Sequence, residues 1–429
     1  MAILQPAFSD KRGNLAAGFD GAQLRGLPDD GMMLTKPAAA GRKGRDGLKL
    51  LHLGDLHLGK SVLETPMLSM QREVLEQAVA YAVEKKVDGV LLAGDVYDRS
   101  VPPVEAVELF DDFLESLERA AIPVLAIPGN HDSPERLHFG SRIFSRRGIH
   151  IAGAFDGRVE TVSLHDRHGE VRIHLLPFLR PAMLRRAGME AANTGEAVAA
   201  VLAAQDNGPT ADPDVRHVLL AHQFVTAGGR NPEACDSETP SVGGSDNVDV
   251  SVFDGFDYVA LGHLHGPQRM GRDTVRYAGS PLKYSLSETG HHKSFAVVTL
   301  EEKGTAGVEL VPFRPSRDLR RLQGTLADLL AAGETDPNRE DYVWAVLTGD
   351  PVLDPAARLR RVYPNLLHVQ TAAEDTAGKA GAAPSPDAPR ASEEELFAAF
   401  FRSVCGKELD AGQDKTVTDT LTRLRGGGD

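Results

Sequence analysis

The chain has 429 residues but few cysteines and no long apolar segment, and each shortage excludes a class of protein. Its two cysteines, Cys235 and Cys405, lie far apart in the sequence. A disulfide framework is therefore excluded, and the cysteine content is typical of a protein in the reducing cytoplasm. No run of about 18 or more apolar residues occurs, so we expect no membrane span. The phosphate-binding pattern G-x-x-x-x-G-K-[ST] is also missing, so we do not expect ATP binding by that loop.

Positive charge is scarce as well, because 47 basic residues face 61 acidic ones and the formal net charge is −14. Proteins that bind nucleic acid are usually basic where they touch phosphate, so any binding by the isolated chain is expected to be weak. Arginine is nevertheless concentrated in three stretches, namely Arg136, Arg142, Arg146 and Arg147; Arg180, Arg185 and Arg186; and Arg314, Arg317, Arg320 and Arg321. Each cluster is as typical of a solvent-exposed helix surface as of a phosphate-binding surface.

Five short segments with metal-binding side chains each follow a short apolar run. The segments are Asp55-Leu56-His57, Gly94-Asp95-Val96-Tyr97-Asp98, Gly129-Asn130-His131-Asp132, Ala221-His222 and Gly262-His263-Leu264-His265. The apolar runs at residues 48–53, 89–93, 122–127, 217–220 and 258–261 predict buried strands. Helical patterns at residues 67–86 and 103–120 separate the first three strands. In the second pattern the expected apolar face is Val104, Val107, Phe110, Phe113, Leu114 and Leu117.

Strands that alternate with helices predict an α/β fold with a parallel sheet. Ligands of such sheets gather at the carboxyl ends of the strands, where all five segments lie. One site can therefore be assembled from residues that are far apart in the sequence.

The residue types in these segments favour a hydrolytic site with two metal ions. Asp55 and His57 are two positions apart on an extended segment and can reach one metal together. Asp95 can bridge two cations through its two oxygens, and Asn130 offers an amide oxygen. Nitrogen ligands come from His222, His263 and His265. A set without thiolate suits manganese, iron, magnesium or zinc in a hydrolytic site.

Two metal ions about 3.5–4 Å apart can support displacement at phosphorus. His131 directly follows Asn130 and would be crowded as a further ligand, so its expected role is to protonate the leaving oxygen. Either Asp132 or Asp98 could hold an imidazole in the required tautomer.

The five segments together resemble the motifs of the calcineurin-like metallophosphoesterases. Residues 51–60 (LHLGDLHLGK), 94–102 (GDVYDRSVP), 129–137 (GNHDSPERL) and 277–288 (YAGSPLKYSLSE) further resemble the SbcD family, the nuclease subunits of bacterial SbcCD complexes. The resemblance implies a two-sheet sandwich flanked by helices, then a small α/β capping domain and a C-terminal helical motif.

The resemblance also implies the ligand sets. One metal takes Asp55, His57, Asp95 and His265, and the second takes Asp95 as a bridge with Asn130, His222 and His263. His131 is the implied catalytic acid, and Arg136 is a candidate substrate contact. The implied metal is Mn²⁺. The implied reaction is hydrolysis of phosphodiesters in DNA, at double-stranded ends, hairpins and single strands. The implied partner is an SbcC-type ATPase, bound by a homodimer of this chain within a heterotetramer.

The expected domain organisation follows composition and resemblance together. Residues 1–47 are expected to be a disordered extension, with Met32 or Met33 as alternative starts, followed by the nuclease domain at 48–300 and the capping domain at 301–371. Residues 372–391 are rich in Ala, Gly and Pro and predict a flexible linker. Residues 392–429 predict two short helices. The first starts at Ser392 and bears an apolar stripe that either folds back on the body or docks on the partner. Two other functions stay open: a metallophosphoesterase for cyclic nucleotides or phosphoproteins, and a metal-free scaffold that positions another nuclease.

Overall fold

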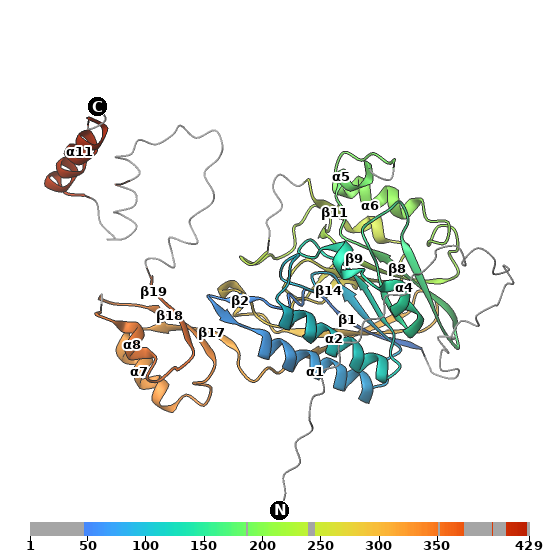
Figure 1. Cartoon of the computed structure of the whole chain (residues 1–429), viewed down its shortest axis with the longest axis horizontal. Helices are drawn as coiled ribbons and strands as arrows, with labels where there is room; N and C mark the ends of the chain where they lie inside the picture. Colours follow the sequence, from blue (N-terminus) through green and yellow to red (C-terminus); the bar gives the residue numbers. More distant parts are fainter. Residues whose placement is uncertain are drawn as a thin grey trace, which may run out of the picture. The chain divides into compact units, whose positions relative to one another are not determined.

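The computed structural model is built around two six-stranded sheets (Figure 1). The first sheet has the strand order β16–β15–β1–β4–β5–β6. Its strands are β1 (Leu48–Leu53), β4 (Gly89–Ala93), β5 (Val124–Ile127), β6 (Ile149–Ile151), β15 (Ser294–Leu300) and β16 (Ala306–Pro312). Strands β1, β4, β5 and β6 run parallel, as expected from the alternating pattern, while β15 and β16 are antiparallel additions at one edge.

The second sheet has the order β13–β14–β12–β9–β8–β7. Its strands are β7 (Glu160–Asp166), β8 (Gly169–Leu176), β9 (Arg216–His222), β12 (Tyr258–Gly262), β13 (Gln268–Met270) and β14 (Arg272–Tyr277). Side chains of both sheets share one buried core, to which Leu50 and Leu125 contribute from the first sheet and Ile173 and Val218 from the second. The sheets therefore pack face to face, which confirms the expected sandwich.

Helices cover the outer faces of the sandwich. On the first sheet, α1 (Leu68–Glu84) and α2 (Val104–Arg119) lie side by side (Figure 1), and on the second, α6 (Thr194–Ala203) packs into a separate core. The expected apolar face of α2 was wrong in its first turn. Val104 and Val107 are exposed, while Ala106 and Leu109 are buried with Phe110 and the residues that follow. The buried face begins with Ala106, whose small side chain lies close to Gly59 in the loop after β1.

Shorter elements complete the sandwich. They are the strand pairs β2 (Ser61–Val62) with β3 (Thr65–Pro66) and β10 (Phe224–Thr226) with β11 (Asn247–Asp249), the helices α3 (Pro134–Leu137), α4 (Ser141–Phe144) and α5 (Pro181–Leu184), and the 3₁₀ turns η1 (Ser145–Arg147), η3 (Val250–Phe253) and η4 (Leu286–Glu288). Strand β16 corrects the expected boundary at residue 300. It pairs with β15 over its whole length, so the sandwich continues to Pro312.

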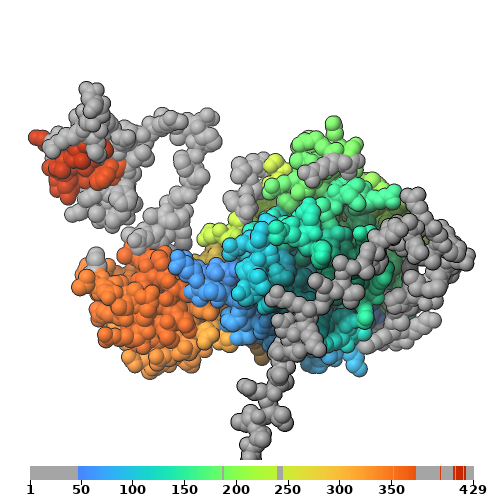
Figure 2. Space-filling model, in the orientation of Figure 1, coloured from blue at the N-terminus to red at the C-terminus, as the bar shows by residue number. Residues whose placement is uncertain are grey.

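A third, three-stranded parallel sheet follows the sandwich. It consists of β17 (Leu319–Gly324), β18 (Tyr342–Leu347) and β19 (Leu366–Thr371), joined by α7 (Leu326–Thr335) and α8 (Pro355–Leu359). Leu329 and Leu359 of the two helices pack with Val343 and Leu366 of the sheet, and the module forms one continuous body, orange in Figure 2. This confirms the small α/β domain that the resemblance implies after the sandwich.

The structure describes residues 47–185, 188–238, 245–350, 352–372, 397 and 409–426. The expected N-terminal extension, nearly all of the linker 372–391 and most of the helix expected from Ser392 lie outside these residues. The second expected helix is present as α11 (Ala411–Gly426). Across the described residues, every helix is too short or too polar to cross a membrane.

Candidate metal centre

The site forms where the carboxyl ends of both sheets meet. The loop after β1 is tied to the loop after β4, because the backbone N–H groups of Asp55 and His57 donate to the carbonyls of Gly94 and Asp95 at 3.1 and 2.9 Å. The two sheets are joined by the backbone N–H of His263, which donates to the Asp55 carboxylate at 2.8 Å. All seven expected ligand residues are thus brought to one place. His222 and Gly262 are themselves the last residues of β9 and β12, so two of the five segments begin inside a strand.

The backbone of the site is held in an unusual conformation. Four residues have positive φ although none is glycine: Asp55 (52°), His57 (45°), Asp95 (48°) and His263 (106°). Such conformations cost on the order of 1–3 kcal/mol each and persist only where the surrounding structure enforces them. They turn the chain sharply at the strand ends, so that successive side chains point into the same space.

Close packing of the strand ends demands glycine at the neighbouring positions. A Cβ on Gly94 would lie 2.3 Å from Nδ1 of His222, and one on Gly262 would lie 1.7 Å from the carbonyl oxygen of Ala93. A Cβ on Gly129 would lie 2.1 Å from the Asp95 carboxylate. These glycines are therefore required by the close approach of His222, Asp95 and the main chain of Ala93.

One group of ligand atoms contains His222, His263 and Asn130. The Nδ1 of His222 lies 2.8 Å from the carbonyl of Ala93, which can only accept, so Nδ1 carries a proton. In the neutral ring, Nε2 then presents a lone pair to Oδ1 of Asn130 at 3.0 Å. Nδ1 of His263 approaches the same oxygen at 3.0 Å. Electron-rich atoms that converge in this way fit a cation between them.

A second group forms around His57 and His265, whose Nε2 atoms are 3.0 Å apart. Nδ1 of His265 lies 2.9 Å from the hydroxyl of Ser237 and 3.3 Å from the carboxylate of Glu288. Because the Ser237 hydroxyl donates to Glu288, it accepts from Nδ1 of His265. The lone pair of His265 therefore lies on Nε2, and Nε2 of His57 is 3.6 Å from the Asp95 carboxylate. This second group could also hold a cation, to which Asp95 would contribute a carboxylate oxygen.

Asp95 lies between the two groups. Its Oδ2 is 3.3 Å from Nε2 of His222, and its Oδ1 accepts from the backbone N–H of His131 at 2.9 Å. Burial opposes its ionisation, but the imidazoles of His222 and His57 outweigh burial and hold the pKa of Asp95 below its usual range. Asp55 is fully buried, which raises its pKa, and its Oδ2 has no hydrogen-bond partner in the described part of the chain. An unpartnered buried carboxylate oxygen is what a bound cation would satisfy.

Burial keeps two of the imidazoles neutral, which is the form that can bind a metal. Burial lowers the pKa of His57 to about 4 and that of His263 to about 3, which keeps both rings neutral. Burial would also lower the pKa of His222, but the carboxylates of Asp95 and Asp55 raise it to about 9. A cation at this place therefore competes with a proton on His222.

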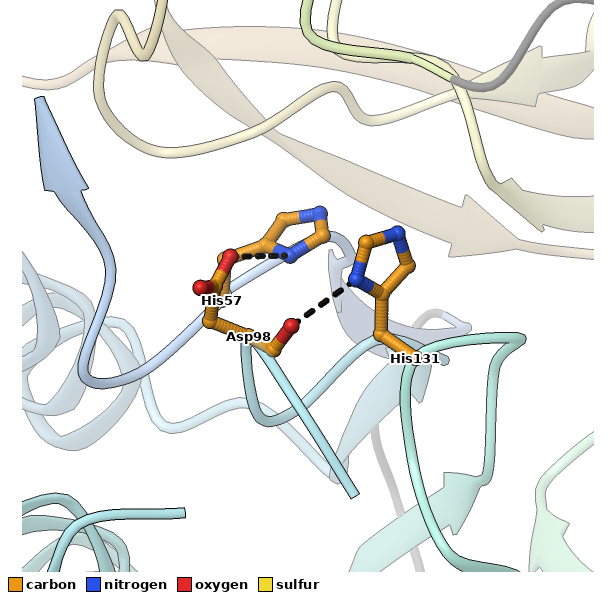
Figure 3. Close-up of side chains that lie close together, drawn as sticks. All are labelled: His57, Asp98 and His131. Carbon is orange, nitrogen blue, oxygen red and sulfur yellow. Dashed lines mark hydrogen bonds and ion pairs between the residues drawn. The ribbon is translucent and has the colours of Figure 1, made fainter. Parts of the chain in front are cut away.

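His131 lies at the edge of the two groups, half-buried. Figure 3 shows its ring and that of His57 both turned toward Asp98. Nδ1 of His131 donates to the main-chain carbonyl of Asp98 at 2.8 Å, and Nδ1 of His57 lies 3.5 Å from the Asp98 carboxylate. Lys60 forms an ion pair with the same carboxylate at 2.7 Å. Asp98 therefore lies against both imidazoles, through its main-chain carbonyl for His131 and through its carboxylate for His57.

Asp132 has a different task. Its carboxylate accepts backbone N–H bonds from Val96, Tyr97 and Gly129 at 3.1, 2.9 and 2.9 Å, so it joins the loop after β4 to the loop after β5. Burial and the charge of Asp95 raise the pKa of Asp132 to about 6. Arg136 is exposed on α3, and among the described residues only its main chain makes a hydrogen bond near the site.

Sequence reasoning missed the buried residues behind the ligands. Glu288 forms a 2.6 Å ion pair with Lys293 directly beneath His265. The side chain of Gln71 donates to the carbonyl of His57 at 2.7 Å and to the hydroxyl of Tyr284 at 2.9 Å. Glu288 and Tyr284 both lie in the motif at residues 277–288. The position of a charged residue at the end of this motif was the sequence feature that could have identified Glu288.

Two groups of described residues have carboxylate and imidazole ligand atoms within 4.8 Å of one another: Asp55, Asp95 and His222, and His57, Asp98 and His131. This fold and these clusters define the class. Residues 48–267 match the family model described as Calcineurin-like phosphoesterase, which is more than half of the chain, and the chain belongs to that family. It is a metallophosphoesterase with a candidate centre for two metals.

A narrower relationship follows from the rest of the chain. Residues 315–404 match the SbcD-type model described as Type 5 capsule protein repressor C-terminal domain. A relative from Staphylococcus epidermidis, the SbcD subunit of the nuclease SbcCD, is 29% identical over 323 residues, which are 75% of this chain and 84% of that protein. The chain is therefore SbcD-like.

Two solved structures share 15% identity with the chain. A protein of Thermus thermophilus covers 62% of this chain and 100% of its own, with a TM-score of 0.39. A dimetal phosphatase from Danio rerio covers 63% and 100%, with a TM-score of 0.37.

Proposed function

We propose that this chain is the nuclease subunit of an SbcCD-type complex and hydrolyses phosphodiesters of DNA with two divalent cations, Mn²⁺ in the first place. The observation that supports this most is the convergence of lone pairs on either side of Asp95, in a chain whose C-terminal part is SbcD-like. One cation would be held by Asp55, His57, Asp95 and His265. The other would be held by Asp95, Asn130, His222 and His263.

Bound cations would supply an activated water and offset charge on the phosphoryl oxygens. The chain itself supplies orientation and a proton. His131 keeps its Nδ1 proton on the Asp98 carbonyl, so Nε2 is the atom from which a proton reaches the leaving oxygen. The backbone N–H of His131 on Asp95 keeps the ring next to the metal ligands.

The decisive experiment is a nuclease assay of the purified chain on linear and hairpin DNA with Mn²⁺, with and without an SbcC-type ATPase. Replacing His131 with serine should leave the metal content unchanged and abolish cleavage. Unchanged cleavage would refute the role of His131 as the acid. Absence of any DNA cleavage by the wild-type chain with its partner would refute the nuclease proposal.

We also propose that two copies of the chain associate through the surface around α3 and α4. Phe139 and Ile143 are 81% and 69% exposed there, and Phe144 is 39% exposed. Apolar side chains gathered in this way mark an interaction surface, and an isologous dimer buries the same patch on both copies. Replacing Ile143 with glutamate should yield a monomer by light scattering. The matched change to glutamate of Leu353, 92% exposed in the loop before α8, should leave the mass unchanged.

The proposed partner explains how an acidic chain can act on DNA. With a net charge of −14, the isolated chain should bind DNA weakly, and the partner should supply much of the affinity. Filter binding tests this, and nanomolar affinity of the isolated chain that resists salt would contradict it.

A further inference from the structure

An exposed arginine lies close to the proposed metal centre and contacts none of its ligands directly. Arg180 directly precedes α5 and is exposed. Its guanidinium lies 5.1 Å from the centre of the Phe178 ring. That ring meets the imidazole of His222 edge-on, with centroids 6.1 Å apart. A single aromatic ring therefore separates Arg180 from a proposed metal ligand.

The segment that bears Arg180 is anchored to the site on both sides. The backbone N–H of Phe178 donates to the carbonyl of Pro128 at 3.1 Å, directly before the turn that contains Asn130. Leu179 is fully buried, and its carbonyl accepts from the side chain of Gln223, the residue after His222, at 3.4 Å. Arg180 thus has a defined position relative to the ends of β5 and β9.

The charge of Arg180 is available, unlike the charges of Lys60 and Lys293, which also lie near the site and are paired with carboxylates. Lys60 is neutralised by Asp98 at 2.7 Å, and its side chain is only 16% exposed. Among the described residues, no carboxylate pairs with Arg180. A guanidinium stacked on an aromatic ring is oriented, and its free edge matches the geometry of a phosphate group.

We propose that Arg180, held on Phe178, binds a backbone phosphate next to the scissile one, so that the site prefers a polynucleotide strand to a small phosphodiester. This inference rests on the proposed nuclease function. The phenyl ring between Arg180 and His222 keeps the guanidinium away from the ligand atoms and hence from a phosphate bound to them. A polynucleotide presents a second phosphate on either side of the scissile bond, whereas a small diester presents none.

The test compares two substrates on one set of variants. Kinetics with Mn²⁺ are measured on a single-stranded oligonucleotide and on bis(4-nitrophenyl) phosphate for wild type, Arg180→Gln and Arg180→Lys. For Arg180→Gln, KM on the oligonucleotide should rise about tenfold, as expected for loss of one charged hydrogen-bonding contact, and the salt dependence should weaken by about one unit of slope. Arg180→Lys should recover part of the loss, because the charge remains but the planar edge does not. Rates on the small diester should stay unchanged.

The control variant is Arg119→Gln. Arg119 is the exposed last residue of α2 and pairs with Glu115. This variant should leave the kinetics on both substrates unchanged. An equal loss on both substrates in Arg180→Gln would place Arg180 on the scissile phosphate or in metal binding and would overturn the inference. Unchanged oligonucleotide kinetics would overturn it too. A wild-type chain that cleaves the small diester but no DNA would refute the nuclease function itself, before any variant is compared.

Discussion

Replacing Glu288 with glutamine tests the metal centre from behind its ligands. The carboxylate is fully buried and accepts from Lys293 and from Ser237, each at 2.6 Å. The same carboxylate lies 3.3 Å from Nδ1 of His265. A buried carboxylate behind a ligand imidazole fixes the tautomer of the ring and makes the other nitrogen more basic. Glutamine keeps the shape of the side chain and removes the charge.

Two effects of different size should follow. Loss of a partner of this kind weakens metal affinity by roughly 10–100-fold. Separately, Lys293 has a side chain only 5% exposed and would lose its counter-charge. A buried charge left without its partner costs roughly 3–5 kcal/mol of folding stability. The metal-free variant should therefore be clearly destabilised, and its Mn²⁺ affinity should also fall.

A double variant separates the two effects. Glu288→Gln combined with Lys293→Met leaves no unpaired charge, so the free energy of unfolding of the metal-free protein should recover in part, while the loss of metal affinity should remain. Urea unfolding after chelator treatment measures the first quantity, and calorimetric titration with Mn²⁺ measures the second. Glu302→Gln, on an exposed turn, is the control and should change neither. If Glu288→Gln bound Mn²⁺ as tightly as wild type, Glu288 would be only a structural residue. Its role in making His265 a better metal ligand would then be refuted.

Three further predictions concern the backbone and the pH dependence. Gly94→Ala should abolish metal binding, because φ is +86° there and the new Cβ would displace His222, whereas Gly307→Ala, with open space around it, should be neutral in the same titration. Asp132→Asn should destabilise the metal-free protein by roughly 1–3 kcal/mol in urea unfolding, since an amide nitrogen cannot accept the buried N–H groups; an unchanged midpoint would contradict this. Burial lowers the pKa of His52 from 6.5 to about 3, so below pH 6.5 the unfolded chain binds a proton that the folded chain does not. The free energy of unfolding should therefore fall by about 1.4 kcal/mol per pH unit as the pH decreases from 6.5 toward 3. His52→Gln, which cannot titrate, should flatten this slope.

The core strands could be predicted because their signals are local. The apolar runs that become β1 and β4 have the bounds expected from sequence, and each is followed by a glycine and then by an aspartate. The small sheet after the sandwich lies at residues 319–371, within the range where the resemblance implies a small α/β domain. The start of the buried face of α2 was not predictable, because an apolar residue in the first turn can face either the sheet or the solvent.

The sequence by itself determined which side chains can bind metal and that each lies at the end of a strand, since apolar periodicity and turn residues act over a few positions. Only the tertiary structure decided how these side chains are grouped and which nitrogen of each ring is free. His57 and His265 meet although 208 positions separate them, and the Ala93 carbonyl that sets the tautomer of His222 is 129 positions away. Glu288 and Asp132 likewise have neighbours that the fold brings close from distant parts of the chain. Hydrogen bonds and ion pairs depend on distance in space, and no local pattern in the chain records that distance.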